Sequence, residues 1–502
     1  MSTYRSRLSF QIKRIRDFWR NFRRSKRGIF GIGILSFYIF LALAAPLLTP
    51  NDPAFGFYVA GDFAVPIWFK YLPGGERLNE NFILSDDPGF TKITTLFENW
   101  KFETSSPELV SYVYEPNVGG GSAAVVFRRK DPWTLADRVE AHLTAEFPWP
   151  YDPPRRFYCN ITVYAKGVEL VPAIVQVTIR RVGEEPTYPP FWNLMLDHTT
   201  MSGIKPYPRL DSYVPEFKAR VGGEAWSDPA KIVFSEPANY LYDISIIFMD
   251  NNKETLGKPV EAIVYFDDLN IRCYGTAYGL LGTDYRGRDI FAQFVYGARV
   301  SLQVGLLSAI LSVVIGLIVG LVAGYAGGIV DEILMRFTDM LLVLPQLPLL
   351  IVLIAVLGTS QWNLILLIGV LGWMGFARTV RSQTLSLKER PFVEAAKAVG
   401  SGTSHILTRH ILPNVMSLVY VTLALSVPNA IISEAALSWL GLFDPKVVSW
   451  GRMLYDAQWN EGVERLWWIV PPGISIALVS LSFILLGYAL DEILNPRLRR
   501  RR

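Results

Sequence analysis

The chain has 502 residues, 51% of them hydrophobic, and a formal net charge of +4. This length leaves room for two or three domains, and the average hydrophobicity alone does not separate a membrane protein from a soluble one. The basic residues gather beside long apolar runs, which argues for a membrane surface and against nucleic acid as their partner.

Six apolar runs are predicted to cross a membrane as helices. The first, Gly28 to Leu48, has no charged residue. As a helix it would be about 31 Å long, enough to span a bilayer. The later runs lie at about 301–323, 340–357, 364–377, 415–437 and 469–490. The expected fold of this part is a polytopic bundle of six transmembrane helices.

The distribution of positive charge predicts how these spans are oriented. Residues 1–27 carry ten Lys or Arg and one acid, and the tail 498–502 ends in four Arg. Both ends are therefore assigned to the cytoplasm, as six spans require. A cleaved signal peptide is the alternative for the segment 28–48, but that run is too long, so an uncleaved anchor is favoured. The connection around 331–339 fits poorly, because its net charge is negative on the cytoplasmic side.

A large insert, residues 54–276, separates the first predicted span from the other five. It contains 21 basic and 29 acidic residues, a net charge of −8, so the remainder of the chain carries +12. This asymmetry predicts an acidic domain outside the membrane and a basic membrane body.

Both cysteines of the chain, Cys159 and Cys273, lie in this insert. A disulfide between them is expected in an oxidising compartment, and two buried free thiols are the alternative. Asn160 begins the tripeptide Asn-Ile-Thr, a weak signal for glycosylation.

The insert is predicted to be mainly β. Alternating or β-branched runs recur at 157–164, 174–179, 232–234 and 262–266, with glycine- and proline-rich breaks between them. Such spacing favours a sandwich, and the last segment, Val264 to Ile271, looks like the closing strand of carbohydrate-binding jelly-roll modules. The insert is thus either a glycan-binding module or a docking module. The tryptophans that could stack on sugars are Trp100, Trp133, Trp149, Trp192 and Trp226.

A framework of glycines and charged residues follows the insert. It consists of Gly282, Thr283, Asp284, Gly287, Arg288, Asp289, Arg336 and Asp339. Their order resembles that in permease subunits of oligopeptide and dipeptide ABC importers, over about residues 20–53 and 277–497. The resemblance implies an ABC permease fold for the core, 277–497, in the inner membrane of a prokaryote.

A basic loop at about 382–413 separates two of the apolar runs. Its middle is predicted to be a short amphipathic helix, which Gly400 ends at low steric cost. The spacing resembles the EAA motif of ABC importer permeases, where this loop inserts into a groove of the ATPase subunit. The residues that carry the likeness are Glu394, Ala395, Ala396, Gly400, Leu412 and Pro413.

Two features inside the spans have a packing interpretation. Gly316, Gly320 and Gly324 recur at intervals of four, which permits close helix contact. Glu434 is a carboxylate well inside an apolar run, and it is expected to face protein near the external mouth.

Catalytic signatures are missing from the sequence. It has no Gly-x4-Gly-Lys-Ser/Thr phosphate loop, and its four histidines form no metal-ligand pattern with the cysteines. It also has no nucleophile elbow. We therefore expect no enzyme activity, cofactor or metal, and the substrate-contacting residues stay undefined.

The sequence thus predicts a permease subunit of an ATP-driven importer. The resemblance implies as partners a second homologous permease, two ABC ATPase subunits, an extracytoplasmic substrate-binding protein and the lipid bilayer. It implies short peptides as cargo, with oligosaccharides as the alternative. A membrane-anchored glycan-binding or adhesion protein and an ion-coupled secondary transporter are the competing functions.

Overall fold

The computed structural model describes residues 16, 19–20, 22–85, 87–197, 205–206 and 210–494. Of the predicted basic N-terminal segment 1–27 only part is described, and the tail 498–502 lies outside the described residues. The chain divides into two compact units, a helical one made of Met1–Phe57 and Arg288–Arg502, and a β-rich one made of Tyr58–Gly287. Each unit is described by itself.

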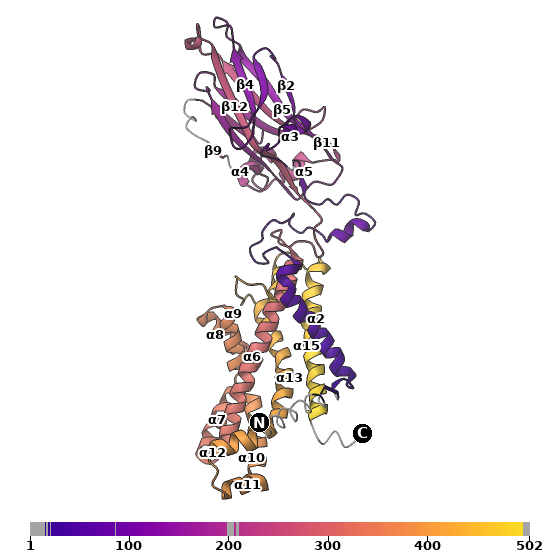
Figure 1. The fold of residues 1–502 in the computed structure, drawn as a ribbon, viewed down its shortest axis with the longest axis vertical. Coiled ribbons are helices and arrows are strands. Elements are labelled where there is room, and N and C mark those ends of the chain that lie inside the picture. Colours follow the sequence, from indigo (N-terminus) through magenta and orange to yellow (C-terminus); the bar gives the residue numbers. More distant parts are fainter. Residues whose placement is uncertain are drawn as a thin grey trace, which may run out of the picture. The chain divides into compact units, whose positions relative to one another are not determined.

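Long helices and short connecting helices make up the helical unit (Figure 1). They are α2 (Lys26–Leu48), α6 (Ile290–Ala326), α7 (Gly328–Val343), α8 (Gln346–Leu357), α9 (Gln361–Val370), α10 (Met374–Lys388), α11 (Pro391–Ala398), α12 (Thr403–Ile406), the π-helix η3 (Leu407–Ile411), α13 (Leu412–Trp439), α14 (Trp450–Trp459) and α15 (Leu466–Leu494).

Within the described chain, five helical stretches are long and apolar enough to cross a membrane. They are Lys26–Leu48, Ile290–Ala326, Gln361–Lys388, Thr403–Trp439 and Leu466–Leu494. The run at 340–357 forms no single straight helix, because α7 and α8 meet there at 89°. Pro345 lies at this break and has no N–H to continue α7. The exact number of spans, five or six, depends on whether this bent pair is one span.

Helix α6 is the centre of the helical unit and contacts α2, α9, α10 and α13 (Figure 1). Its glycines at intervals of four lie against the backbone of α10, which confirms their packing role. A Cβ on Gly316, Gly320 or Gly324 would stand 2.8, 2.5 or 2.8 Å from the carbonyl oxygen of Trp373, Ala377 or Arg381, respectively. Larger residues would therefore force the two helices apart.

The β-rich unit consists of two antiparallel sheets. The first has the order β10-β6-β12-β4-β3, with β1 on β12 and β9 on β6, and the second has the order β2-β5-β11-β7-β8. The strands are β1 (Phe82–Ile83), β2 (Lys101–Thr104), β3 (Val110–Glu115), β4 (Ser122–Arg129), β5 (Asp137–Trp149), β6 (Arg156–Lys166), β7 (Ala173–Arg181), β8 (Trp192–Leu196), β9 (Lys205–Pro206), β10 (Leu210–Asp211), β11 (Ala238–Asp250) and β12 (Val260–Tyr274). Short helices are η1 (Ile67–Tyr71), α3 (Ile93–Asn99), α4 (Pro215–Gly222), α5 (Pro229–Val233) and η2 (Lys253–Thr255).

One apolar core joins the two sheets of this unit. Alternate residues of each strand point into it, as the period of a pleated strand requires. Phe127 of β4 and Phe248 of β11 stack across it at 5.3 Å between ring centroids, and both are fully buried. The predicted β-rich character of the insert is confirmed.

The two cysteines correct the disulfide expectation. Cys159 pairs with Ile271, whereas Cys273 pairs with Phe157, so the cysteines are diagonal neighbours on β6 and β12. Diagonal positions are roughly 7–8 Å apart, beyond the usual reach of a disulfide. Both are free, buried thiols. Burial raises the pKa of the Cys159 thiol to about 12, which makes it inert.

The segment 277–287 folds with the β-rich unit, although the sequence analysis placed it with the permease core. Ala277 forms a parallel bridge with Val65. The N–H of Val59 donates to the Gly287 carbonyl at 2.9 Å. The backbone following the first long helix thus pairs with the backbone preceding α6.

Candidate functional site

The loop at 382–413, here called the coupling loop, forms a helix-turn-helix at one end of the helical unit (Figure 1). Helix α11 ends in a Schellman motif: the N–H of Gly400 donates to the carbonyl of Lys397 at 2.9 Å, and that of Ser401 to Ala396 at 3.0 Å. Gly400 has φ +84°, a conformation that favours glycine. This explains its position at the end of the helix.

The coupling loop has one buried face and one exposed face. Val393 is fully buried with Ile406, Ile411 and Val415, which fixes α11 to the start of α13. Glu394 and Ala395 are exposed and Ala396 is half-buried. The hydrophobic side chain of Val399 is 86% exposed. Phe392, seven residues earlier, is also exposed at 42%, and exposed apolar side chains that share a helix face are typical of a contact surface.

Leu412 and Pro413 begin α13 directly after the π-helix. Pro413 lies within the continuous helical stretch Thr403–Trp439, and it has no N–H to donate to the preceding turn, which is π-helical. Within the π-helical stretch and its neighbour, His405 and His410 lie five residues apart with ring centroids at 5.9 Å. The residues of the predicted motif are thus spread over α11, its cap and the start of α13.

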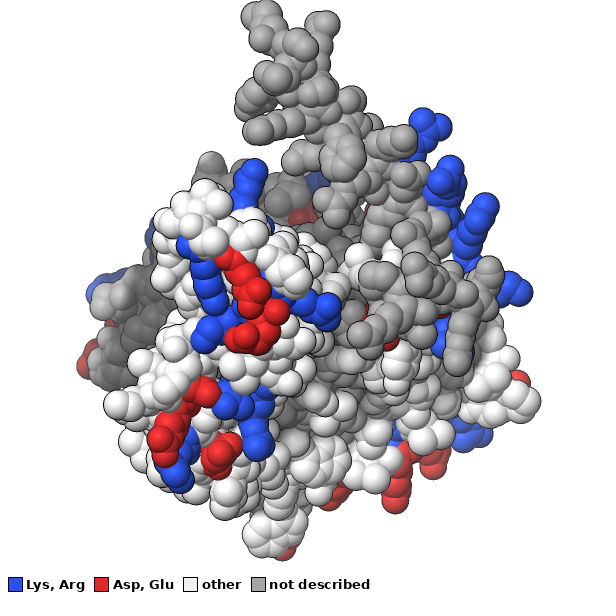
Figure 2. All heavy atoms as spheres, turned by 90° about the horizontal axis from the view of Figure 1, so that it is seen from below, with Lys and Arg blue, Asp and Glu red and all other residues white. Residues whose placement is uncertain are grey.

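Ion pairs on α7 explain the acidic connection that fitted the charge rule poorly. Asp331 makes a two-pronged contact with Arg381 of α10, 2.6 Å from Nη2 to Oδ2, and Asp339 lies 3.5 Å from Arg378. Arg336 pairs with Glu332 at 2.9 Å. Basic and acidic side chains accordingly lie side by side at this end of the unit (Figure 2). Asp331 and Asp339 thus pair with arginines of α10, the basic helix that leads into the coupling loop.

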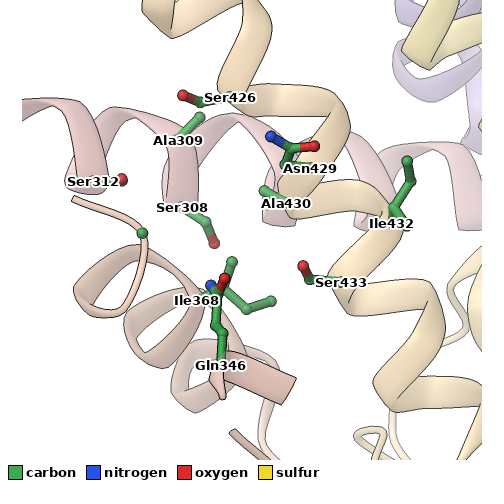
Figure 3. A pocket seen from close by; sticks show the side chains of 11 residues that line it. Ser308, Ala309, Ser312, Gln346, Ile368, Ser426, Asn429, Ala430, Ile432 and Ser433 are labelled. Atoms are coloured by element: carbon green, nitrogen blue, oxygen red, sulfur yellow. The ribbon is translucent and has the colours of Figure 1, made fainter. Parts of the chain in front are cut away.

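A polar cavity of about 290 Å³ lies between α6, α8, α9 and α13. Ser308 and Ser312 of α6, Gln346 at the start of α8, and Asn429 and Ser433 of α13 face the same space (Figure 3). The remaining lining residues are Ala309, Ile368, Gly372, Ser426, Ala430 and Ile432. The sequence analysis missed this set, although Ser426, Asn429 and Ser433 recur at helical spacing within an apolar run.

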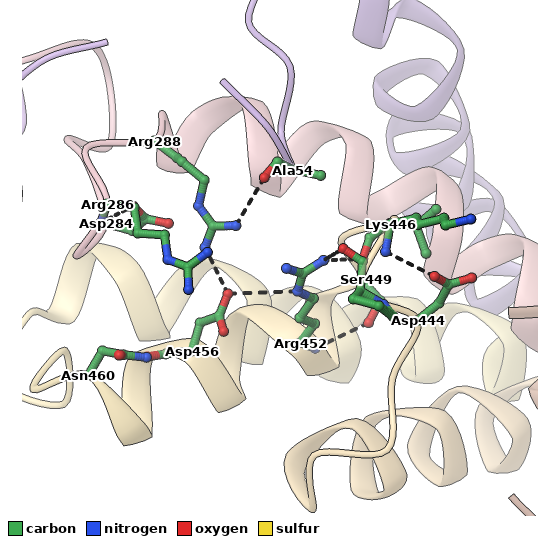
Figure 4. A network of polar contacts seen from close by, with 12 residues as sticks. Ala54, Asp284, Arg286, Arg288, Asp444, Lys446, Ser449, Arg452, Asp456 and Asn460 are labelled. Atoms are coloured by element: carbon green, nitrogen blue, oxygen red, sulfur yellow. Dashed lines mark hydrogen bonds and ion pairs between the residues drawn. The ribbon is translucent and has the colours of Figure 1, made fainter. Parts of the chain in front are cut away.

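A buried network of charges connects the start of α6 to α14 (Figure 4). The Arg288 guanidinium is 1% exposed and lies 3.0 Å from Asp456; Arg452 lies 3.8 Å from the same carboxylate. Arg452 also donates to the carbonyls of Pro445 and Val447 at 3.0 and 2.7 Å. Arg288 therefore acts as an anchor, and its partner Asp456 was not among the predicted residues.

Glu434 is fixed at the edge of this network. It is 2% exposed, and its Oε1 accepts hydrogen bonds from Ser438 at 2.8 Å and Ser449 at 2.6 Å. Ser449 also caps α14, since its Oγ accepts from the N–H of Arg452 at 3.1 Å. Glu434 thus holds the loop after α13 to the helix itself, as the packing interpretation predicts.

The other framework residues serve local backbone geometry. In the β-rich unit, Thr283 Oγ1 accepts from the N–H of Ala64 at 2.8 Å, and Asp284 accepts from the N–H of Arg286 at 2.8 Å. Gly282 and Gly287 have φ +70° and +64°; a Cβ on either would collide with a backbone oxygen. In the helical unit, Asp289 caps α6 by accepting from Phe291 at 2.9 Å.

The candidate glycan residues of the β-rich unit divide into two groups. Trp100, Trp149 and Trp192 are core residues, whereas Trp133 and Trp226 are 75% and 79% exposed. Asn160 lies within β6, where it pairs with Asn270 and is half-buried. These residues do not gather into one site.

Asp267 is the most perturbed carboxylate of the β-rich unit. It lies at a bulge of β12, next to Asp268, whose φ is +55°. The carboxylate accepts a hydrogen bond from the N–H of Asp268 at 2.7 Å. Burial raises the pKa of Asp267 to about 6. Among the described residues, no group of three or more His, Cys, Asp or Glu could hold a metal ion.

Two sequence families match the chain. "Binding-protein-dependent transport system inner membrane component" covers residues 316–500, and "N-terminal TM domain of oligopeptide transport permease C" covers residues 13–66. Both matches lie outside most of the β-rich unit.

Curated relatives agree with these families. The dipeptide transport system permease protein of Bacillus subtilis is 40% identical over 225 residues, 44% of this chain and 69% of the relative. The glutathione transport system permease protein of Shigella flexneri is 40% identical over 242 residues, 48% of this chain and 80% of the relative. A solved structure of the inward-facing MetNI methionine ABC transporter matches with a TM-score of 0.31 and 17% identity, over 39% of this chain and 96% of that chain.

A bundle of apolar helices of this length is typical of a membrane protein. The chain belongs to the family of permease components of binding-protein-dependent ABC importers, in its oligopeptide and dipeptide branch. It is therefore a multi-pass inner-membrane protein that works with ATPase and substrate-binding partners. Its relatives are transport permeases, so the chain is a transport subunit and not an enzyme, and this function prevails over adhesion or ion-coupled transport.

Proposed function

We propose that the chain pairs with a second, homologous permease and that two ATPases drive the pair, each through one coupling loop. The observation that carries this proposal is the exposed α11 surface, anchored through Val393 and capped at Gly400. Because α11 is packed against the start of α13, a displacement of α11 by the ATPase would move the two helices together. ATP-driven closure of the ATPases would then tilt the helices that line the path.

The route of that motion runs from α11 through α10 to α6. Helix α10 precedes the coupling loop and is bound to α7 by the Arg381–Asp331 pair. It also packs directly on the glycine stripe of α6. Because α6 lines the polar cavity through Ser308 and Ser312, a shift of the coupling loop reaches the cavity through two close-packed helices.

The proposed topology has six spans, with α7 and α8 as one bent span. Both termini and the coupling loop lie in the cytoplasm, and the β-rich unit lies outside. The basic composition of residues 1–27 supports this orientation. The pairing of Asp331 and Asp339 with arginines removes the one charge pattern that opposed it.

We infer that the β-rich unit is a jelly roll outside the membrane that docks the binding protein. From β4 to β7 successive strands alternate between the sheets, and the orders β4-β12-β6-β10 and β5-β11-β7-β8 fit two interlocked Greek keys. The net charge of −8 on residues 54–276 favours a basic partner surface and an encounter that salt weakens. If raising the salt concentration leaves stimulation of the ATPase by the binding protein unchanged, this docking role is wrong.

Short peptides are the proposed cargo. This rests on the relatives named for dipeptide, oligopeptide and glutathione transport. The direct measurement is stimulation of ATP hydrolysis by binding protein loaded with peptides, compared with oligosaccharides.

The coupling assignment is tested by reversing one charge on the exposed face. Glu394→Arg should leave membrane insertion intact but reduce co-purification of the ATPase and transport at least about tenfold. Glu464→Arg, at an exposed acid between α14 and α15 and outside the coupling loop, is the matched control and should behave as the wild type. Equal transport by both variants, with normal assembly, would count against the assignment.

A further inference from the structure

The polar cavity between α6, α8, α9 and α13 has hydrogen-bonding capacity that the protein does not use. Within the described chain, the side chains of Ser312, Gln346, Ser426, Asn429 and Ser433 line it without a hydrogen-bond partner. Ser308 differs, since its hydroxyl donates to the Ile365 carbonyl at 3.0 Å. Free polar groups on apolar helices are costly unless they face water or a ligand. Gln346 and Asn429 are exposed on the open side of the cavity, so water or a polar ligand can bind to them.

The cavity is also electrically neutral. None of the described residues that line it is charged. The carboxylate nearest in sequence, Glu434, is engaged by Ser438 and Ser449 and lines a different, very small cavity. Hydroxyls and carboxamides bind dipolar groups of either polarity, because they both donate and accept. They give no strong preference for a positive or negative side chain.

The start of α8 brings one carboxamide to the same space. The bend of 89° between α7 and α8 brings the first turn of α8 to the cavity, with Gln346 pointing into it (Figure 3). The carboxamide of Gln346 both donates and accepts hydrogen bonds, so it fits either the N–H or the carbonyl oxygen of a peptide bond.

We propose that this cavity binds the peptide backbone of the cargo and does not discriminate between peptides by the charge of their side chains. The inference rests on the proposed function, since it assumes peptide cargo and a path shared with a second permease. The volume of about 290 Å³ is at the lower end for ligand sites, so the cavity contacts a short stretch of peptide at a time. Asn429 and Gln346 are the residues that make these contacts from opposite sides.

The test uses the complete transporter in proteoliposomes, with binding protein saturated by tripeptides that differ only in a central Glu, Gln or Lys. Wild-type maximal uptake rates should agree within about twofold. Asn429→Asp places a charge in the cavity and should favour the Lys peptide over the Glu peptide by about tenfold. Gln346→Leu combined with Asn429→Leu should slow all three peptides alike. Ser417→Ala, on α13 outside the cavity, is the control and should change nothing.

The outcomes separate this inference from the proposed function. A wild type that takes up no peptide with ATP contradicts the proposed function itself. Uptake that proceeds normally, but with an unchanged Lys-to-Glu ratio in Asn429→Asp, overturns the cavity assignment. A wild type that already discriminates strongly by charge also overturns it. Uptake of oligosaccharides in place of peptides overturns the commitment to a peptide backbone.

Discussion

The two units of this protein pack their elements with different residues. In α6 most of the buried positions are glycine, alanine or serine, such as Ser308 and Gly320, while Ile318 is 57% exposed on the outside. In β11 most of the buried positions are large and apolar, such as Ile244 and Phe248. Small residues therefore make much of the close packing of α6, whereas large apolar residues make that of β11.

The surroundings of each unit explain this difference. Water drives large apolar side chains of the β-rich unit into a common core. A bilayer gives no such drive, because lipid tails are as apolar as the side chains. The helical unit must gain from close backbone contact and from polar groups, so small residues lie inside it. Pairs of matched substitutions, one in a packed position and one in an open position, test this difference.

The largest effect is expected in the sandwich core. Phe127→Ala leaves a cavity against Phe248 and should lower the free energy of unfolding of the β-rich unit by about 3–5 kcal/mol. Ile318→Ala, on the outside of α6, should change the stability of the helical unit by less than about 1 kcal/mol. Hydrogen exchange of both units in the purified full chain measures each effect. Equal losses in the two variants would contradict the comparison.

The next effect concerns the glycine stripe. Gly320→Ala places a Cβ 2.5 Å from the carbonyl oxygen of Ala377, and should cost about 1–3 kcal/mol through forced separation of α6 and α10. Gly33→Ala in α2 meets nothing within 4 Å and serves as control. The thermal midpoint of the protein in detergent should fall for the first variant only. An unchanged midpoint for both would remove the close-contact argument.

A smaller effect is expected at the end of α11. Gly400→Ala meets no atom within 4 Å but must adopt φ +84°, which costs an L-residue roughly 1–2 kcal/mol. Gly402→Ala has ordinary backbone and equally open space. Transport should fall several-fold only in the first variant, because its helix cap frays. If Gly402→Ala causes the same loss, local backbone strain is not the reason.

The smallest effect is a pH dependence of the β-rich unit. Folding raises the pKa of Asp267 from about 3.8 to about 6, so the folded state binds the proton more tightly than the unfolded one. Its contribution to stability is present below about pH 4 and is lost as the pH rises through about 6. In Asp267→Asn the free energy of unfolding of the β-rich unit should therefore depend less on pH between pH 4 and 7 than in the wild type.

Asp131 supplies a control of opposite sign for this pH dependence. Backbone and side-chain hydrogen bonds from Trp133 and Thr134 lower its pKa. The contribution of Asp131 to stability is therefore lost as the pH falls through its lowered pKa, below the range of pH 4 to 7. Asp131→Asn should leave the pH dependence of the free energy of unfolding between pH 4 and 7 unchanged. An unchanged slope in Asp267→Asn would show that another group titrates in this range.

Several features could be predicted from sequence because they depend on local chemistry. The apolar runs, the breaks in the insert and the glycine after α11 all express the conformational preferences of a few neighbouring residues. The framework that resembles the permease family could be recognised for the same reason, since Gly282 and Gly287 adopt the positive φ that their turns require.

Other features depend on register and on distant partners. Cys159 and Cys273 are both buried on neighbouring strands, but a shift of two residues in pairing makes them diagonal. The pairing of Arg288 with Asp456 joins residues 168 positions apart. No local pattern specifies such pairs, because they exist only after the chain has folded.

Apolar helices, a β-rich insert and a short helix that ends at Gly400 can be predicted from the sequence, since periodicity, charge and turn residues act over a few positions. Which polar side chains meet depends on how the whole chain folds. Ser312, Gln346 and Asn429 come from three helices and face one space only because α7 and α8 bend at Pro345 and α6 packs closely. Long-range packing fixes these neighbours, because contacts between distant segments form only when the chain folds.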